Sequence, residues 1–303
     1  MLSVSTAVES SQSPYENMPA SDFSPILLRS ASEFTLEELT DIYNQTRMDY
    51  IVPMPMNPAR LGEYINNYDV VLEHSAVAMA DGQILGLSML GVRSGHTWVT
   101  RLGVLPVQRR HGTGEALMRH HIDSSKILGV DFITLDVIKN NEPAQRLFAK
   151  LGFRENRELL ILRRPPGPPK IDVAPYSVAL MGPDEAAELL EQRRSIPSWL
   201  DENRSLLNAG NLFALRVELQ NGASGWMVYQ KNIFQLGRLV VQTEAGDPRD
   251  VGRTLAHALH SNNPIQDTKT ENFPLHDPHL PGLQDMGYIE SFRRIELRRT
   301  FTY

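Results

Sequence analysis

The sequence predicts an α/β (α+β) fold built as two tandem domains, each with a mixed, mostly antiparallel sheet and helices on both faces. Its 303 residues exceed one small domain and suit two of ordinary size. The segment 165–169 holds four prolines in five residues, which neither a helix nor a central strand can continue. The parts of the chain before and after this segment show the same order of predicted strands and helices, which indicates two related domains.

The composition is that of a soluble globular protein, because hydrophobic residues make up 41% and charged residues 22% of the chain. The net charge of −6 offers no basic surface for nucleic acid or an anionic membrane. The chain has no cysteine, which excludes disulfides, thiolate metal sites and a cysteine nucleophile. No apolar run approaches the roughly 18 residues of a membrane span. We therefore expect a cytoplasmic protein, a monomer or homodimer, with no metal and no nucleic-acid or membrane partner.

The domain boundaries follow from local composition. Residues 1–22 are rich in serine and contain no lysine, no arginine and no apolar core of a signal peptide, so we expect a disordered leader. Residues 23–165 form the predicted N-terminal domain. The proline-rich segment 166–170 is the expected linker, and 171–303 form the C-terminal domain.

Local signals predict the elements of the N-terminal domain. A capping box at Thr35 and Glu38 begins one helix, and Asn57 before Pro58 begins the next. The Asp81-Gly82 pair predicts a hairpin turn. The expected strands cover 25–30, 75–80, 83–92, 97–105, 132–138 and 153–164, and the expected helices cover 35–48, 57–68, 112–127 and 142–151.

The C-terminal domain repeats this order. The expected strands cover 176–181, 212–220, 225–230 and 234–242, and the expected helices cover 183–194, 197–207 and 248–260. Residues 287–299 align with 152–164 without a gap, sharing a glycine, a glutamate, a leucine and two arginines. This agreement predicts an internal duplication.

The segment 97–117 carries the clearest chemical signal. A predicted strand ends at Pro106, and a basic loop with Gly112 and Gly114 leads into a helix. A helix N-terminus presents unpaired N–H groups and a partial positive charge, and glycines let a phosphate approach the backbone. The nucleoside-triphosphate loop is absent, and a dinucleotide fingerprint would need a third glycine where Leu117 stands. A nucleotide-binding regulator is therefore disfavoured.

Two motifs resemble the GNAT superfamily of N-acetyltransferases. The first is Val-x-Pro followed by Arg-x-x-Gly-x-Gly, at Val104, Pro106, Arg109, Gly112 and Gly114. The second, 141–153, is similar to the family's Asn-x-x-Ala-x-x-Leu-Tyr helix that ends in Gly-Phe. The resemblance covers residues 23–165 and implies a site for acetyl-coenzyme A (acetyl-CoA) as co-substrate. The cofactor residues that it implies are Leu102, Gly103, Val104, Arg109, Arg110, His111, Gly112, Thr113, Gly114, Glu115, Asn141 and Phe148.

The sequence departs from the family pattern at the general acid. The resemblance implies a tyrosine where this chain has Phe148, which has no proton to donate and which either stacks on the pantetheine or packs in the core. Asp136 and His96 are the two candidate bases for an amine that is mostly protonated at neutral pH. In this family the connection between the first two helices lines the acceptor site, which implicates Tyr50 and Met54 in substrate binding. Glu63, on the following helix, is a further candidate that would face a cationic acceptor.

The matching loop of the C-terminal domain has lost both motifs. Glu244, Asp247 and Asp250 stand where a pyrophosphate would sit, and acidic groups there oppose anion binding. We therefore expect a degenerate copy without coenzyme A. The resemblance predicts acetyl transfer to a small-molecule or protein amine in a ternary complex, and the alternative is a non-catalytic CoA-binding sensor or partner-binding protein.

Overall fold

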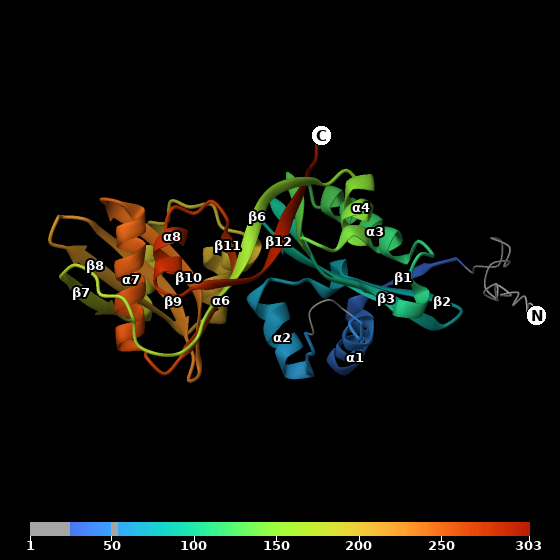
Figure 1. Ribbon diagram of the computed structural model, residues 1–303. Helices are drawn as coiled ribbons and strands as arrows, with labels where there is room; N and C mark the ends of the chain where they lie inside the picture. Colours follow the sequence, from blue (N-terminus) through green and yellow to red (C-terminus); the bar gives the residue numbers. More distant parts are fainter. Residues whose placement is uncertain (1–24, 50–53) are drawn as a thin grey trace, which may run out of the picture.

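The computed structural model describes residues 25–49 and 54–303; Tyr50 and the predicted leader 1–22 lie outside this part of the chain. The described strands form one twelve-stranded sheet that runs through both halves of the molecule (Figure 1). The strands are β1 Leu27–Ser30, β2 Ala76–Ala80, β3 Gln83–Arg93, β4 His96–Val104, β5 Phe132–Ile138, β6 Arg154–Arg164, β7 Tyr176–Met181, β8 Leu212–Leu219, β9 Ser224–Lys231, β10 Gln235–Ala245, β11 Asp267–Pro274 and β12 Ile289–Thr300.

Helices cover both faces of this mixed, mostly antiparallel sheet, as predicted. They are α1 Leu36–Thr46, α2 Pro58–Asn67, α3 Thr113–Ile127, α4 Glu142–Lys150, α5 Pro183–Glu191, α6 Asn203–Ala209, α7 Pro248–Asn262 and α8 Leu280–Asp285. In the N-terminal half, α1 and α2 pack on one face, and α3 and α4 pack on the other. In the C-terminal half, α5 and α6 lie opposite α7 and α8.

The two halves exchange their last strands. The sheet order is β1-β2-β3-β4-β5-β12-β6-β11-β10-β9-β8-β7, so β12 lies between β5 and β6 and is antiparallel to both. We expected each half to close its own sheet, and the structure corrects this. The residues 153–164 do form a strand, but β6 pairs with β11 and β12 of the C-terminal half.

The buried side chains explain the exchange. Ile295 and Leu297 of β12 are 4% and 5% exposed and belong to the core beneath α3 and α4. In return, Leu160 and Leu162 of β6 are buried in the core of the C-terminal half. Each hydrophobic core therefore contains a strand from the other half, and a cut at the proline-rich segment does not separate two self-contained units.

Local signals set the element boundaries more reliably than they set the long-range pairing. The Thr35 capping box and the Asn57 cap begin α1 and α2 as predicted. The expected helix over 197–207 is instead a 3-10 turn at Trp199–Asp201 followed by α6. Two elements were not predicted from the sequence: β11, whose polar sequence lacks an apolar run, and α8, which has only six residues.

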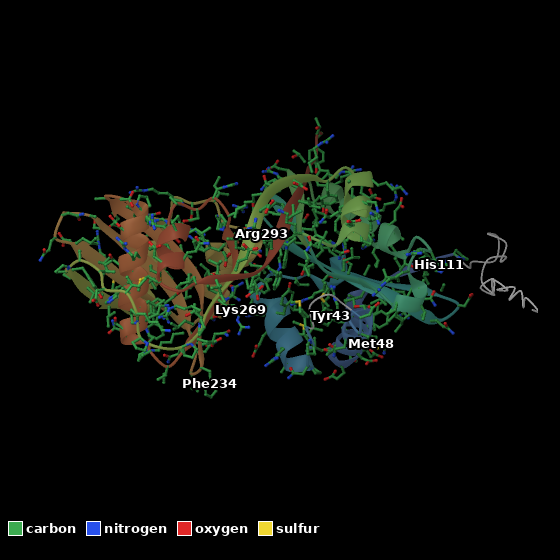
Figure 2. All side chains as sticks on the ribbon, in the orientation of Figure 1. Tyr43, Met48, His111, Phe234, Lys269 and Arg293 are labelled. Carbon is green, nitrogen blue, oxygen red and sulfur yellow. The ribbon has the colours of Figure 1, made fainter. Side chains whose placement is uncertain are left out.

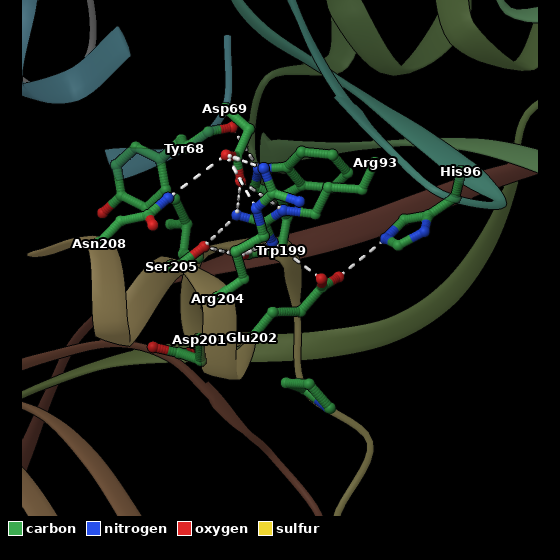
Figure 3. Close-up of polar contacts among 12 residues, drawn as sticks. Tyr68, Asp69, Arg93, His96, Trp199, Asp201, Glu202, Arg204, Ser205 and Asn208 are labelled. Atoms are coloured by element: carbon green, nitrogen blue, oxygen red, sulfur yellow. Dashed lines mark hydrogen bonds and ion pairs between the residues drawn. The ribbon is translucent and has the colours of Figure 1, made fainter. Parts of the chain in front are cut away.

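Besides the strand exchange, a cluster of polar contacts around the buried Arg93 joins the two halves (Figure 3). The Arg93 side chain is 4% exposed and lies 2.8 Å from carboxylate oxygens of both Asp69 and Glu202. It also donates to Ser205 Oγ at 2.7 Å and stacks on the Trp199 ring at 4.2 Å. The two carboxylates compensate a buried charge that would be costly without a partner, and they come from different halves of the chain.

We expect the fragment 1–170 to be insoluble or unfolded when it is produced alone. Without β12, one edge of β5 is unpaired, and the core loses Ile295 and Leu297, each worth about 1.5–3 kcal/mol of burial. Production of 1–170 together with 171–303 should restore a soluble complex, measured by co-elution and circular dichroism. A folded, monomeric 1–170 would contradict the exchange.

Candidate active site

Strands β4 and β5 separate at the centre of the N-terminal half. They pair in parallel only from His96 with Phe132 to Val99 with Leu135, and diverge beyond that point. A bulge in β4 accompanies the separation, with Arg101 at a positive φ of 53°. A bulge bends the strand that carries it. The gap leaves the facing backbone groups of β4 available to a ligand.

One side of the gap opens into a cavity of about 570 Å³, here called the cofactor cavity. It lies between the end of α1, the end of β4, the start of α3 and the start of α4. Its walls contain all the predicted cofactor residues except His111 and Phe148, together with Thr46, Arg47, Asp49, Gln108, Pro143, Ala144 and Leu147.

The start of α3 is open for an anion. Gly112 is the N-cap at φ 83°, and no side chain caps the helix there. A Cβ on Gly112 would meet nothing within 4 Å, so the loop leaves space above the first helical N–H groups. The Thr113 hydroxyl is buried with no hydrogen-bond partner among the described residues. These features fit a phosphate or diphosphate.

Three arginines, Arg47, Arg109 and Arg110, line the cofactor cavity. Arg109 forms a bidentate ion pair with Asp49, at 2.7 Å to each oxygen, and this contact lowers the pKa of Asp49. Arg47 donates to the Leu102 carbonyl oxygen at 2.9 Å. Because the Arg109 pair is exposed, solvent weakens it and leaves the guanidinium exchangeable.

The other side of the gap opens into a second cavity of about 320 Å³, here called the acceptor cavity. The two cavities share Arg47, Leu102, Asn141 and Ala144, so they meet at the gap between β4 and β5. The C-terminal half supplies part of the wall through Leu200, Glu271, Phe292 and Arg294. The remaining lining residues include Met54, Tyr64, Tyr68, Trp98, Thr100, Arg101, Asp136 and Phe148.

Asp136 lies in the wall of the acceptor cavity on β5. Its Oδ2 accepts from Asn272 Nδ2 at 3.1 Å. Burial raises the pKa of Asp136 to about 6, the negative charge of Glu296 acts in the same direction, and Arg294 and Asn272 oppose them. Asp136 is therefore largely ionised at neutral pH and poised to take up a proton.

The contact to Asp136 comes from a bulge in β11. Asn272 has a positive φ of 58°, and the register between β11 and β6 shifts at this point. Its Oδ1 accepts from Arg294 Nη1 at 2.9 Å, and the same nitrogen is 3.0 Å from Glu271 Oε2. Burial alone would raise the pKa of Glu271, but Arg294 and Lys269 outweigh it and hold that pKa well below its usual range.

The structure does not bring His96 to this site. Its Nε2 lies 2.8 Å from Glu202 Oε1, and its ring stacks on Phe132, outside both cavities (Figure 3). The prediction of His96 as a base is corrected accordingly, because its ring belongs to the contact between the halves. Asp136 and His96 lie toward opposite ends of the paired stretch of β4 and β5.

Three other predicted residues have different placements. Glu63 is exposed on α2 and lines neither cavity, which corrects its prediction as a substrate residue. His111 is exposed at the end of the N-terminal half remote from the C-terminal half (Figure 2). Phe148 is buried against Phe153 and contributes to the acceptor cavity, not to the cofactor cavity.

Sequence reasoning missed the contributions of the C-terminal half. Glu271 and Asn272 lie on the unpredicted β11, and Arg294 reaches the site through the strand exchange. Tyr64 and Arg101 were also missed, although Tyr64 is one residue after Glu63 and points inward to Thr100. The helical period of α2 could have identified Tyr64, whereas no local signal identifies the other side chains.

The comparisons with known proteins agree with this geometry. Residues 36–153 match the model of the acetyltransferase (GNAT) family. The N-terminal half is a GNAT domain. The match confirms the resemblance of the two motifs, and it spans the α1–α4 region, which forms the cofactor cavity and most of the wall of the acceptor cavity. The family implies acetyl-CoA, and the open α3 N-terminus with its unpartnered Thr113 hydroxyl fits the pyrophosphate of that molecule.

A curated relative supports an acetyltransferase. Mycothiol acetyltransferase of Clavibacter michiganensis subsp. michiganensis (strain NCPPB 382) is 36% identical over 76 residues, which are 25% of this chain and 25% of that protein. The matched segment thus spans about a quarter of the relative's length.

Solved structures share the fold across both halves. A tandem GNAT protein from the clavulanic acid biosynthesis pathway aligns with a TM-score of 0.62 at 16% identity, covering 91% of this chain and 98% of that one. A GCN5-related N-acetyltransferase from Sphaerobacter thermophilus aligns with a TM-score of 0.67 at 13% identity, covering 91% and 96%. The C-terminal half of this chain therefore has a structural counterpart beyond the GNAT domain.

Two features are absent from the described part of the chain. No helix in 25–49 or 54–303 is both long and apolar enough to cross a membrane. Within the same ranges, no cluster of three histidine, aspartate or glutamate side chains is arranged to hold a metal ion.

We expect Gly112→Glu to abolish acetyl-CoA binding, with an affinity loss of more than about 100-fold, because the new carboxylate would oppose the pyrophosphate. Gly129→Glu is the matched control. Gly129 follows the other end of α3, has a positive φ of 68° and also has open space at its Cβ, so it reproduces the backbone strain. Calorimetric titration of both variants is the measurement, and equal affinity in the two would place the diphosphate elsewhere.

Proposed function

We propose that the chain is an acetyl-CoA-dependent N-acetyltransferase that moves an acetyl group to an amine by direct attack. The observation that supports this most is the meeting of two cavities at the gap between β4 and β5. An open helix N-terminus lies in the first cavity, and the ionisable Asp136 lies in the second. Acetyl-CoA supplies an activated thioester when it is bound.

In this proposal the cofactor cavity binds the pyrophosphate at the N–H groups of residues 112–115. Arg109 exchanges its exposed pair with Asp49 for the phosphate, since guanidinium groups bind both anions through paired hydrogen bonds. The edge of β4 at Leu102, Gly103 and Val104 has no strand partner on the side of β5, so the pantetheine amides would pair there in competition with Arg47 and Arg109, which donate to the Leu102 and Val104 carbonyl oxygens. The acceptor amine then reaches the gap from the opposite cavity.

Asp136 is the proposed base. An alkylamine has a pKa near about 10 and carries a proton at neutral pH, so the proton must leave before attack. The Asp136 carboxylate accepts it directly or through one water. Asn272 and Arg294 hold the carboxylate in place through the hydrogen bonds described above.

The leaving thiolate needs no acid from Phe148. A thiol has a pKa of about 8.5, so its thiolate is a fair leaving group and water can protonate it. Phe148 then serves as part of the apolar wall of the acceptor cavity.

We further propose that the C-terminal half is a degenerate GNAT-like copy that binds no coenzyme A. The Asp247 carboxylate caps the start of α7 by accepting from the N–H groups of Arg249 and Asp250, at 2.9 Å and 3.1 Å. The backbone of α8 lies against the same turn, because a Cβ on Gly282 would clash with the Arg249 carbonyl oxygen. The N–H groups at the start of α7 and the space above them, which a pyrophosphate would need, are therefore both occupied.

A non-catalytic CoA sensor is the alternative, and the absence of a hydroxyl at Phe148 favours it. Release of free thiol from acetyl-CoA in the presence of an amine separates the two functions. Turnover with any small-molecule or protein amine supports the enzyme. Binding without turnover across an amine panel supports the sensor.

We expect Asp136→Asn to lower kcat by about 10²- to 10⁴-fold without weakening acetyl-CoA binding. In the parent protein, activity should rise with pH through about 6 as Asp136 loses its proton, and the variant should lack this limb. Burial raises the pKa of this acid above its unfolded value, so its ionisation costs stability as pH rises through about 6. The variant should therefore be no less stable than the parent at pH 8. Full turnover in the variant would remove Asp136 from the mechanism.

We expect Asn272→Gly to shift the rise of activity with pH to a pH higher by about one unit, because the lost hydrogen bond normally lowers the pKa of Asp136. Glycine tolerates the positive φ, so the backbone is preserved. Asn211→Gly is the matched control, since Asn211 has φ 53° and lies outside both cavities. An unchanged limb in Asn272→Gly, with turnover retained, would show that Asn272 does not position the carboxylate.

A further inference from the structure

A third cavity lies between the two halves, on the same face of the sheet as the acceptor cavity but at the other end of β4 and β5. We call it the rear cavity; its volume is about 460 Å³. The sheet forms its floor through side chains of β4, β5, β6 and β12, and the segment 193–204 forms its roof. The charged residues that line it are Arg157, Arg193, Glu202, Arg204, Glu296 and Arg298. None of these residues lines the acceptor or the cofactor cavity.

Arg298 carries a charge that the described residues do not compensate. Its guanidinium lies over the Phe132 ring at 3.6 Å, but it forms no ion pair and no hydrogen bond in 25–49 or 54–303. The Nε atom is buried in the floor without an acceptor. A buried donor without a partner is costly, and an arginine fork is suited to a carboxylate or a phosphate.

Arg193 adds a second cation from the roof. It donates to Ser195 Oγ at 2.8 Å and to the Asp201 carbonyl oxygen at 2.6 Å, which are neutral groups. Its guanidinium forms no ion pair in the part of the chain that the structure describes. Burial lowers the pKa of Arg193, and the nearby charges of Asp201, Asp277 and Glu202 only partly oppose this, so an anionic partner would add to the compensation of its charge.

The other charged residues of the rear cavity are paired. Arg157 binds Glu296 at 2.8 Å and also donates to the Ile196 and Pro197 carbonyl oxygens. Glu202 binds Arg93 and His96, as Figure 3 shows. Arg204 binds Asp69. The cavity therefore has an excess of positive charge at Arg193 and Arg298.

We propose that the rear cavity binds a small anion that carries a carboxylate or a phosphate group. The anion accepts from Arg298 in the floor and from Arg193 in the roof, and the volume suits a small metabolite. Because the floor and the roof come largely from different segments of the exchanged sheet and the C-terminal half, a bound anion stabilises their contact. This site is independent of the proposed transferase reaction.

The test is calorimetric titration of the full-length protein with inorganic phosphate and, separately, with citrate, at concentrations up to about 10 mM. We expect saturable binding of at least one probe and a rise in melting temperature, because a ligand that binds only the folded chain stabilises it. Arg298→Gln should weaken the binding about 10- to 100-fold through loss of the charged donor. Arg146→Gln, an exposed arginine on α4, is the control and should not change it.

A second variant tests the same site independently, in case Arg298→Gln does not fold. Ser195 is exposed, and Ser195→Asp places a carboxylate beside Arg193, which should also abolish binding. Binding of citrate alone would assign the site to carboxylates, and binding of phosphate alone would assign it to phosphates. Absence of saturable binding overturns the proposal. Binding that survives both variants but disappears in Gly112→Glu also overturns it, since the probe would then occupy the start of α3.

Discussion

The outer edge of β5 has no partner from its own half, so its backbone donors and acceptors are satisfied only by β12. This single pairing brings side chains of the C-terminal half to the wall of the acceptor cavity. It places Glu296 opposite both Asp136 and Arg157, and it carries Arg294 to the same end of the sheet as Asn272. Because β12 lies between β5 and β6, the next strand after β6 is β11, and its bulge contributes to the wall of the acceptor cavity. The site of the GNAT domain is thus completed by strands that belong to the second half of the sequence.

Both halves have a residue at positive φ where a strand separates from its parallel neighbour, but the surroundings of that residue differ. Arg101 in β4 and Arg238 in β10 both have positive φ, 53° and 51°, at the point where each strand leaves its parallel neighbour. In the N-terminal half the gap is open and is flanked by two cavities. In the C-terminal half, Arg238 instead donates to the Tyr68 hydroxyl and the Leu200 carbonyl oxygen, so the corresponding position helps to join the halves. The point where β10 separates from β11 thus forms part of the contact between the halves.

Local chemistry made the elements and the anion-binding loop predictable from the sequence. The caps at Thr35 and Asn57 and the glycines at the start of α3 act within a few residues of their positions, and the structure places them as predicted. The strand exchange could not be predicted, because β6 and β12 have nearly the same pattern and either could close either sheet. The acceptor cavity depends on that choice, which is why Glu271, Asn272 and Arg294 were missed. His96 was misjudged for the same reason, since its partner Glu202 is far away in sequence.

The order of synthesis gives the strand exchange a further consequence. A ribosome makes β12 after every other strand, so the N-terminal core stays incomplete while β7 to β11 are being made. Domains usually fold in turn as they emerge, with the first finished before the second. Here the first half must wait for the second, and a chain interrupted before Ile289 has neither a closed core nor a complete acceptor cavity. The fold thereby couples the presence of a working site to completion of the strand that ends at Thr300.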